Sequence, residues 1–109
     1  MNLDKKRMNV VKTAKTGKVN RETIFEFHQE GSIVTARYAG GKILQGFLVG
    51  KIKEDKLEFR YSQIDSEENL DGGFSICEMK KLENGKVQLI EHFQWESIEG
   101  TGENVIEEI

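Results

Sequence analysis

The sequence has no proline and only one cysteine, and both shortages limit what the chain can be. Because Cys77 has no partner in the chain, the fold cannot rest on internal disulfides. The N-terminus also lacks the apolar stretch of a secretory signal, and together these features indicate a reducing, cytoplasmic location. Long hydrophobic runs are missing as well, so we expect no membrane-spanning helix and no membrane partner.

An excess of charge of one sign is also absent. The chain has 16 Lys and Arg against 19 Asp and Glu, a net charge of −3, and its basic residues are spread along the sequence. A nucleic-acid binder concentrates positive charge, so no nucleic-acid partner is predicted. With 109 residues, of which 37% are hydrophobic and 32% charged, the chain is too apolar for disorder and long enough for one core. We therefore expect one soluble domain over residues 1–109.

Glycine, in contrast, occurs 11 times and separates segments rich in Val, Ile, Thr, Phe and Tyr. Tight turns are predicted at Thr16-Gly17, Glu30-Gly31, Gly40-Gly41, 53–56 and Asn84-Gly85, and longer loops at 65–69 and 99–102. The predicted strands cover residues 7–14, 21–29, 32–39, 42–53, 56–64, 72–82, 86–96 and 103–109. Seven connections thus give eight strands, and no segment keeps the apolar stripe of a helix.

These strands predict an all-β fold, a single antiparallel up-and-down meander of eight strands. Such a meander can close into a small barrel, and closure removes the exposed edges that an open sheet leaves. A flattened sandwich and a curled open sheet are the alternative folds. A barrel of this strand number is either filled by its own side chains or holds one small ligand.

The turn at Glu30-Gly31 predicts which side chains face the core. If these residues form a two-residue turn, Phe25, Phe27, Val34 and Tyr38 share one face, and this apolar face is the core.

The next turn, Gly40-Gly41, extends the pattern to the following strand. It places on the core side Ile43, Gln45, Phe47 and Val49. Simple pairing with this strand would turn the apolar residues of the fifth strand away from the core; these are Leu57, Phe59 and Tyr61. A β-bulge near Gly46 or Gly50 would restore the phase, and we predict one there.

The Asn84-Gly85 turn predicts a pair of carboxylates. A two-residue turn places Glu78 opposite Glu91 on a face that carries Phe74, Ile76, Phe93 and Trp95. A buried pair of like charges raises one pKa and suits acid/base catalysis, whereas a slipped register leaves both groups solvated. The reverse face pairs Cys77 with His92, which is more typical of packing than of catalysis.

No motif predicts a cofactor or a metal. Neither a phosphate-binding loop nor a dinucleotide fingerprint occurs, and the His and Cys spacing matches no metal site. The residues that suit a ligand pocket are aromatic side chains of the predicted core, with polar groups to orient the ligand. They are Tyr38, Phe59, Tyr61 and Trp95, with Gln45, Glu78 and Glu91 as the polar candidates. The alternative is that all of these side chains simply fill the barrel.

Four segments carry a resemblance to known proteins. They read ETIFEFHQEGSIVTARYAGGKILQGFLVG, LEFRYSQID, NGKVQLIEHFQWES and VIEEI. The chain resembles a group of short bacterial proteins of unknown role that often carry the label N-acetylglutamate synthase. The resemblance implies a small all-β domain similar to the avidin and calycin barrels, and it implies no catalytic residues. The label itself implies acetyl transfer from coenzyme A.

Three functions follow as hypotheses. The first is non-enzymatic binding of a small, partly apolar ligand inside the barrel or at its mouth. The second is a protein-interaction or homo-oligomerising module that uses an outer face bearing Leu44, Leu48 and Ile90. The third is an enzyme, either the acetyltransferase of the label or a hydrolase that uses Glu78 and Glu91.

Overall fold

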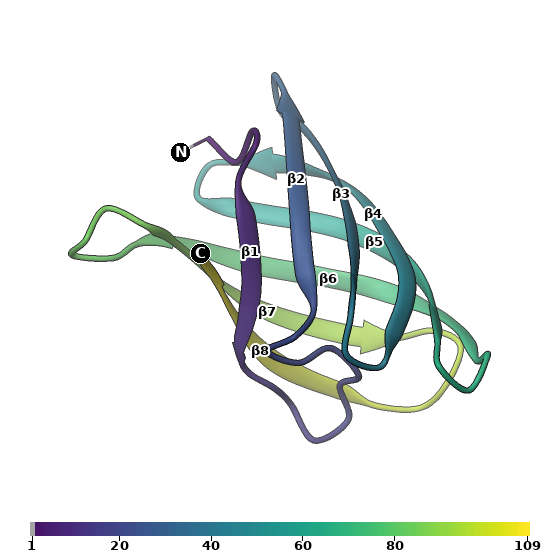
Figure 1. Cartoon of the computed structure of the whole chain (residues 1–109). Helices are drawn as coiled ribbons and strands as arrows, with labels where there is room; N and C mark the ends of the chain where they lie inside the picture. The colour runs from purple at the N-terminus through teal and green to yellow at the C-terminus, as the bar shows by residue number, and fades with distance from the viewer. Residues whose placement is uncertain (1) are drawn as a thin grey trace.

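The computed structural model describes residues 2–109 as eight antiparallel strands in one closed barrel (Figure 1). The strands are β1 (Arg7–Lys12), β2 (Ile24–Glu30), β3 (Ile33–Gly40), β4 (Ile43–Lys53), β5 (Lys56–Asp65), β6 (Leu70–Lys81), β7 (Val87–Trp95) and β8 (Thr101–Glu108). Each strand pairs with the next, and β8 pairs with β1 to close the ring. The predicted meander and its closure are confirmed, and the sandwich and open sheet are wrong. Residues 2–109 include no helix long and apolar enough to cross a membrane.

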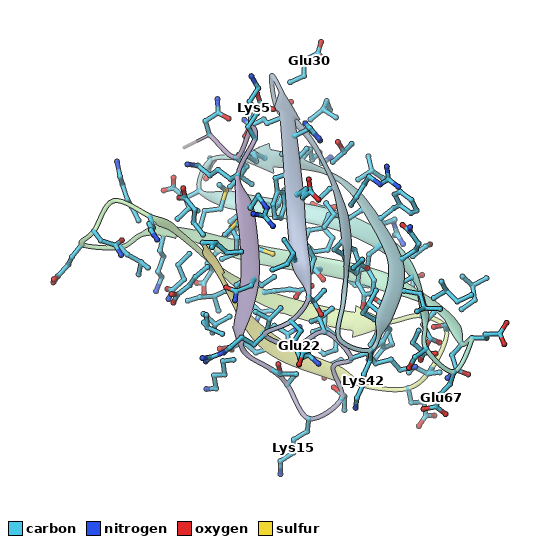
Figure 2. The ribbon with its side chains drawn as sticks, viewed as in Figure 1. Lys5, Lys15, Glu22, Glu30, Lys42 and Glu67 are labelled. Carbon is cyan, nitrogen blue, oxygen red and sulfur yellow. The ribbon has the colours of Figure 1, made fainter. Side chains whose placement is uncertain are left out.

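The barrel has two ends of different construction. We call the mouth the end that carries loops 13–23, 41–42, 66–69 and 96–100, and the base the end that carries loops 31–32, 54–55 and 82–86. Figure 2 shows Lys15, Lys42 and Glu67 at the mouth and Lys5 and Glu30 at the base.

The N-terminal segment closes the base. The Leu3 side chain is fully buried, its backbone N–H donates to Gln29 Oε1 at 2.8 Å, and Gln29 N–H donates to Asp4 Oδ1 at 3.0 Å. Leu57 and Val87 are buried as well. Apolar side chains therefore seal the base of the barrel.

The predicted core face of β2 and β3 is confirmed. Phe25, Phe27, Val34 and Tyr38 are all buried, as period-2 alternation requires. The pairing differs from the prediction, because the turn consists of residues 31–32 and Glu30 pairs with Ile33. This moves the register by two residues, which leaves every side chain on its predicted face.

The predicted face of β4 is wrong beyond its first residue. Ile43 is buried, but Gln45 is exposed, as are Phe47 (51%) and Val49 (58%), and Leu48 points inward. The reason is a register shift between Ile43 and Gln45 at the start of the strand. An extra residue there reverses the parity of everything that follows.

The predicted bulge near Gly46 or Gly50 is therefore misplaced. The β4–β5 ladder runs regularly from Gln45 to Lys53, through both glycines. Gly46 serves packing instead, because a Cβ at this position would overlap the ring of Tyr38. A glycine in β4 thus makes room for an aromatic side chain of the neighbouring strand.

The β6–β7 register also differs from the prediction by one residue. Leu82 N–H bonds to Lys86 O at 2.8 Å, and Gly85 has φ of +85°, so three residues form the turn instead of two. Cys77 therefore faces Glu91 across the strands, whereas Glu78 pairs with Ile90 and lies outside the barrel. The predicted pairs Glu78–Glu91 and Cys77–His92 are wrong.

Two apolar side chains of β6, which the prediction places on the same face as Phe93 and Trp95, point outward. Ile76 is exposed and Phe74 is half-buried on the outer surface. The inner positions of β6 are taken by a glycine and by smaller side chains, including Gly73, Ser75 and Cys77.

Candidate functional site

A small cavity lies in the mouth half of the barrel. Its lining residues are Gly17, Lys18, Val19, Phe25, Tyr38, Phe59, Tyr61, Gln63, Glu91, Phe93, Trp95 and Asn104. The space open to the centre of a water molecule is about 20 Å³. This is far below the roughly 300–1,000 Å³ of pockets that hold a small-molecule ligand.

Aromatic rings form one wall of the cavity. Trp95 makes edge contacts with Tyr61 and Phe93, with ring centroids 5.5 and 5.7 Å apart. Phe59 packs on Tyr61 at 6.1 Å, again edge to face. These rings come from β5 and β7, where alternation turns every second side chain inward. The wall suits a flat or apolar part of a ligand.

Two polar atoms in this wall have no hydrogen-bond partner among residues 2–109. Tyr38 Oη donates to Gln63 Oε1 at 2.8 Å, which turns the Gln63 amide nitrogen the other way. Gln63 Nε2 and Tyr61 Oη are both buried and unpaired. Burial raises the pKa of both tyrosines, so both hydroxyls keep their protons at neutral pH and can donate. The cavity therefore presents two free donors.

Glu91 places a carboxyl group in the same cavity. Ser75 Oγ donates to Glu91 Oε2 at 2.6 Å, and Asn104 Nδ2 donates to Oε1 at 3.0 Å. Burial raises the pKa of Glu91, and these two bonds offset the rise only in part. No ion pair involves Glu91 within residues 2–109.

The Asn104 amide is oriented by a loop residue. Its Oδ1 accepts the backbone N–H of Ala14 at 2.8 Å, so Nδ2 must face Glu91. A loop at the mouth thereby helps to hold the cavity carboxyl in place.

The Cys77 thiol lies beside Glu91 in the ladder but is not a reactive group. Burial raises its pKa well above the ordinary value, with a further contribution from the Glu91 charge. The thiolate, which is the nucleophilic form, is therefore disfavoured.

An ion-pair cluster spans the mouth beside the cavity. Lys18 Nζ contacts Asp65 Oδ2 at 2.9 Å and Asp71 Oδ2 at 2.5 Å. The hydrogen bond from Lys18, together with backbone N–H donors of the 66–69 loop, holds the pKa of Asp65 well below its usual range. The hydrogen bond to Asp71 is the largest cause of a raised Lys18 pKa. Lys18 lines the cavity, and the two carboxylates fully compensate its positive charge.

The comparison with protein-family models decides the family. Residues 1–109 match the model described as "Avidin-like protein". The chain belongs to the avidin-like protein family. No match was found among curated proteins, and none among solved structures. The eight-stranded closed barrel agrees with this assignment, while the acetyl transfer implied by the resemblance stays a prediction.

The avidin-like barrel brings five of the seven predicted site residues to one cavity. They are Tyr38, Phe59, Tyr61, Glu91 and Trp95. The other two are misplaced: Gln45 lies exposed outside because of the register shift in β4, and Glu78 lies 3.6 Å from His92 on the outer surface. Their predicted places at the core are wrong.

Sequence reasoning missed four polar residues of the site. Gln63 continues the alternation of Leu57, Phe59 and Tyr61, so its inward position was legible in the sequence. Ser75 and Asn104 reach Glu91 only through the β6–β7 and β7–β8 registers, which change with the exact length of each turn. Lys18 lies in a segment that is predicted as a tight turn.

The outer face proposed for a protein partner also changes. Leu44 is 53% exposed, but Leu48 is buried and Ile90 is only partly exposed. Phe47 and Val49 take the outward positions on β4 instead, and Arg37 lies over the Phe47 ring at 5.4 Å. An interaction module built on this surface stays a prediction.

Proposed function

We propose that this avidin-like barrel binds one small, partly apolar ligand in the mouth cavity, without catalysis. The observation that carries the proposal is the pair of unpartnered buried donors, Tyr61 Oη and Gln63 Nε2. A buried polar atom without a partner costs about 1–3 kcal/mol. Two such donors in one cavity wall favour a ligand that brings a hydrogen-bond acceptor.

The surrounding groups define the chemistry of the ligand. An acceptor such as a carbonyl oxygen satisfies the two donors, and a flat or apolar body packs on Trp95 and Phe59. The Glu91 carboxyl has no cation beside it within residues 2–109, so a ligand carboxylate would meet like charge or force protonation. Neutral compounds with a carbonyl group, such as amides, fit the site best.

A fragment screen tests the proposal. The ¹⁵N-labelled protein is titrated with small neutral amides and with the matching carboxylates, and the signal of the Trp95 indole N–H is followed. Trp95 is the only tryptophan, so this signal is assigned without ambiguity. We expect amides to shift it and the matching carboxylates to bind more weakly.

Matched variants place the ligand in the cavity. Tyr61→Phe and Gln63→Leu each remove one donor and should weaken amide binding about 3- to 10-fold, the equivalent of one ordinary hydrogen bond. Gln45→Leu is the control, because it makes the same change on the outer surface. The proposal is wrong if no amide shifts the Trp95 signal, or if the bound amides do not distinguish Gln63→Leu from Gln45→Leu.

A further inference from the structure

The cavity as it stands, at about 20 Å³, is much smaller than the roughly 300–1,000 Å³ of a pocket that holds a small-molecule ligand. A ligand can therefore reach Tyr61 and Gln63 only if part of the wall moves. The base offers no route, since Leu3, Leu57 and Val87 fill it with buried apolar side chains.

The mouth offers one movable wall segment. Every lining residue except Gly17, Lys18 and Val19 lies on a strand. Displacing a strand would break ladder hydrogen bonds on both of its sides, whereas a loop can swing as a unit. Gly17–Val19 belong to loop 13–23, which joins β1 to β2 and lies at the mouth end of the barrel (Figure 1).

Side-chain bonds tie this loop to the barrel. Its own backbone–backbone bonds, from Gly17 N to Ala14 O and from Thr23 N to Asn20 O, are internal to the loop. The links to the wall at β7 and β8 are Trp95 Nε1 to Thr16 O at 3.0 Å, Thr16 Oγ1 to Thr101 O at 2.8 Å, and Ala14 N to Asn104 Oδ1 at 2.8 Å.

Lys18 makes the link to the opposite wall. In the ring of eight strands, β5 and β6 lie across from β1 and β2 (Figure 1). The Lys18 side chain crosses the mouth to Asp65 at the end of β5 and to Asp71 in β6. The Lys18 side chain is largely shielded, with an exposure of 24%, and its carboxylate partners are buried, so solvent and salt weaken these ion pairs less than surface pairs.

We propose that loop 13–23 is a lid over the cavity and that Lys18 is the latch that holds it shut. The identity of what the lid admits rests on the proposed function, but the opening itself does not. When the latch is released, Val19 and Thr16 leave the mouth, and the Trp95 indole loses its cover. Lys18 thus acts as a positioning residue that sets how often the cavity is accessible.

Trp95 is a built-in reporter of the lid. It is the only tryptophan, it is 6% exposed, and its indole N–H bonds to the lid at Thr16 O. Acrylamide quenching of its fluorescence therefore measures how often the lid is open. We expect weak quenching of the wild-type protein and an increase of at least 3-fold in the quenching constant of Lys18→Met.

Lys6→Met is the matched control. Lys6 pairs with Glu108 at 3.3 Å, at the base end, with a side-chain exposure of 27% that is close to that of Lys18. Its removal costs one ion pair without touching the lid, so quenching should stay at the wild-type level. Asp71→Asn, which loses the partner charge at nearly constant volume, is the second variant and should also increase quenching.

The outcomes separate the lid from the ligand. Far-UV circular dichroism and the emission maximum of each variant show whether it is folded, so that unfolding is not counted as opening. Unchanged quenching in both folded latch variants would overturn the lid, even if amides bind. Raised quenching in a protein that binds no amide would support the lid and refute the proposed function.

Discussion

The two tyrosines of the cavity should respond in opposite directions to the same substitution. Tyr38→Phe and Tyr61→Phe each remove one hydroxyl from the wall of the same cavity. The Tyr38 hydroxyl donates to Gln63 Oε1 at 2.8 Å, whereas the Tyr61 hydroxyl is buried without a partner. The chemical change is identical, so the difference isolates the hydrogen bond.

The expected magnitudes follow from the two environments. Tyr38→Phe loses a bond and leaves Gln63 Oε1 unpaired, which should lower the free energy of unfolding by about 1–3 kcal/mol. Tyr61→Phe removes an unsatisfied group and should raise it by about 1 kcal/mol. For a domain of this size, 1 kcal/mol corresponds to about 4 °C in the melting temperature. The two variants should therefore differ by about 2–4 kcal/mol in the free energy of unfolding.

Urea unfolding followed by far-UV circular dichroism measures the difference. Circular dichroism is preferable to fluorescence here, because Tyr61 contacts Trp95 and its replacement changes the emission itself. The urea dependence of the free energy should be the same in both variants if only stability has changed. If Tyr61→Phe is destabilised as much as Tyr38→Phe, the Tyr61 hydroxyl has a partner in solution and the main support for the proposed function is lost.

Four further predictions concern charge, packing and the coenzyme. Burial raises the pKa of Glu91, so ionising it costs stability once the pH exceeds its unfolded value of about 4.3; the stability of Glu91→Gln relative to wild type should rise from pH 4 to pH 8 in urea titrations, and a flat difference would contradict this. Asp65 has a lowered pKa, so its carboxylate stabilises the fold above about pH 3.9, and this stabilisation is lost as the pH falls. Asp65→Asn should therefore lose less stability in acid than the wild type. The same loss of stability in both proteins would refute the role of the Lys18 bond. Gly46→Ala places a methyl group against the Tyr38 ring and should cost about 1–3 kcal/mol by thermal unfolding, whereas a cost below about 0.5 kcal/mol, typical of a surface site, would show that the ring can shift. Calorimetry with coenzyme A should give no binding heat, because the cavity, at about 20 Å³, is far smaller than a pocket that holds a small-molecule ligand, and a measurable heat would revive acetyl transfer.

The strands, their meander order and the inner faces of β2, β3 and β5 can be predicted from the sequence. These features are local: glycine-containing turns end the strands, and alternation within one strand decides which side chains share a face. Phe25 and Tyr38 on one face, or Phe59 and Tyr61 on another, need no knowledge of distant residues. The resemblance in four segments likewise pointed to the avidin-like barrel that the family comparison shows.

The tertiary structure alone decided the register of β4 and of the β6–β7 hairpin. One extra residue at Leu44 turned Gln45 outward, and a turn of three residues instead of two put Cys77, not Glu78, opposite Glu91. A single residue reverses a whole strand because the side-chain period is two, and the local sequence fits either register.

The contacts that hold the lid also depend on the tertiary structure. The sequence predicts a tight turn at Thr16-Gly17 between strands 7–14 and 21–29, whereas the structure has a longer loop over residues 13–23. In this loop, Lys18 bonds to residues 47 and 53 positions further along the chain. Contacts across the mouth exist only once the barrel has closed, because closure brings β5 and β6 opposite the β1–β2 loop. The sequence therefore supplied most of the cavity wall, and closure of the barrel supplied its cover.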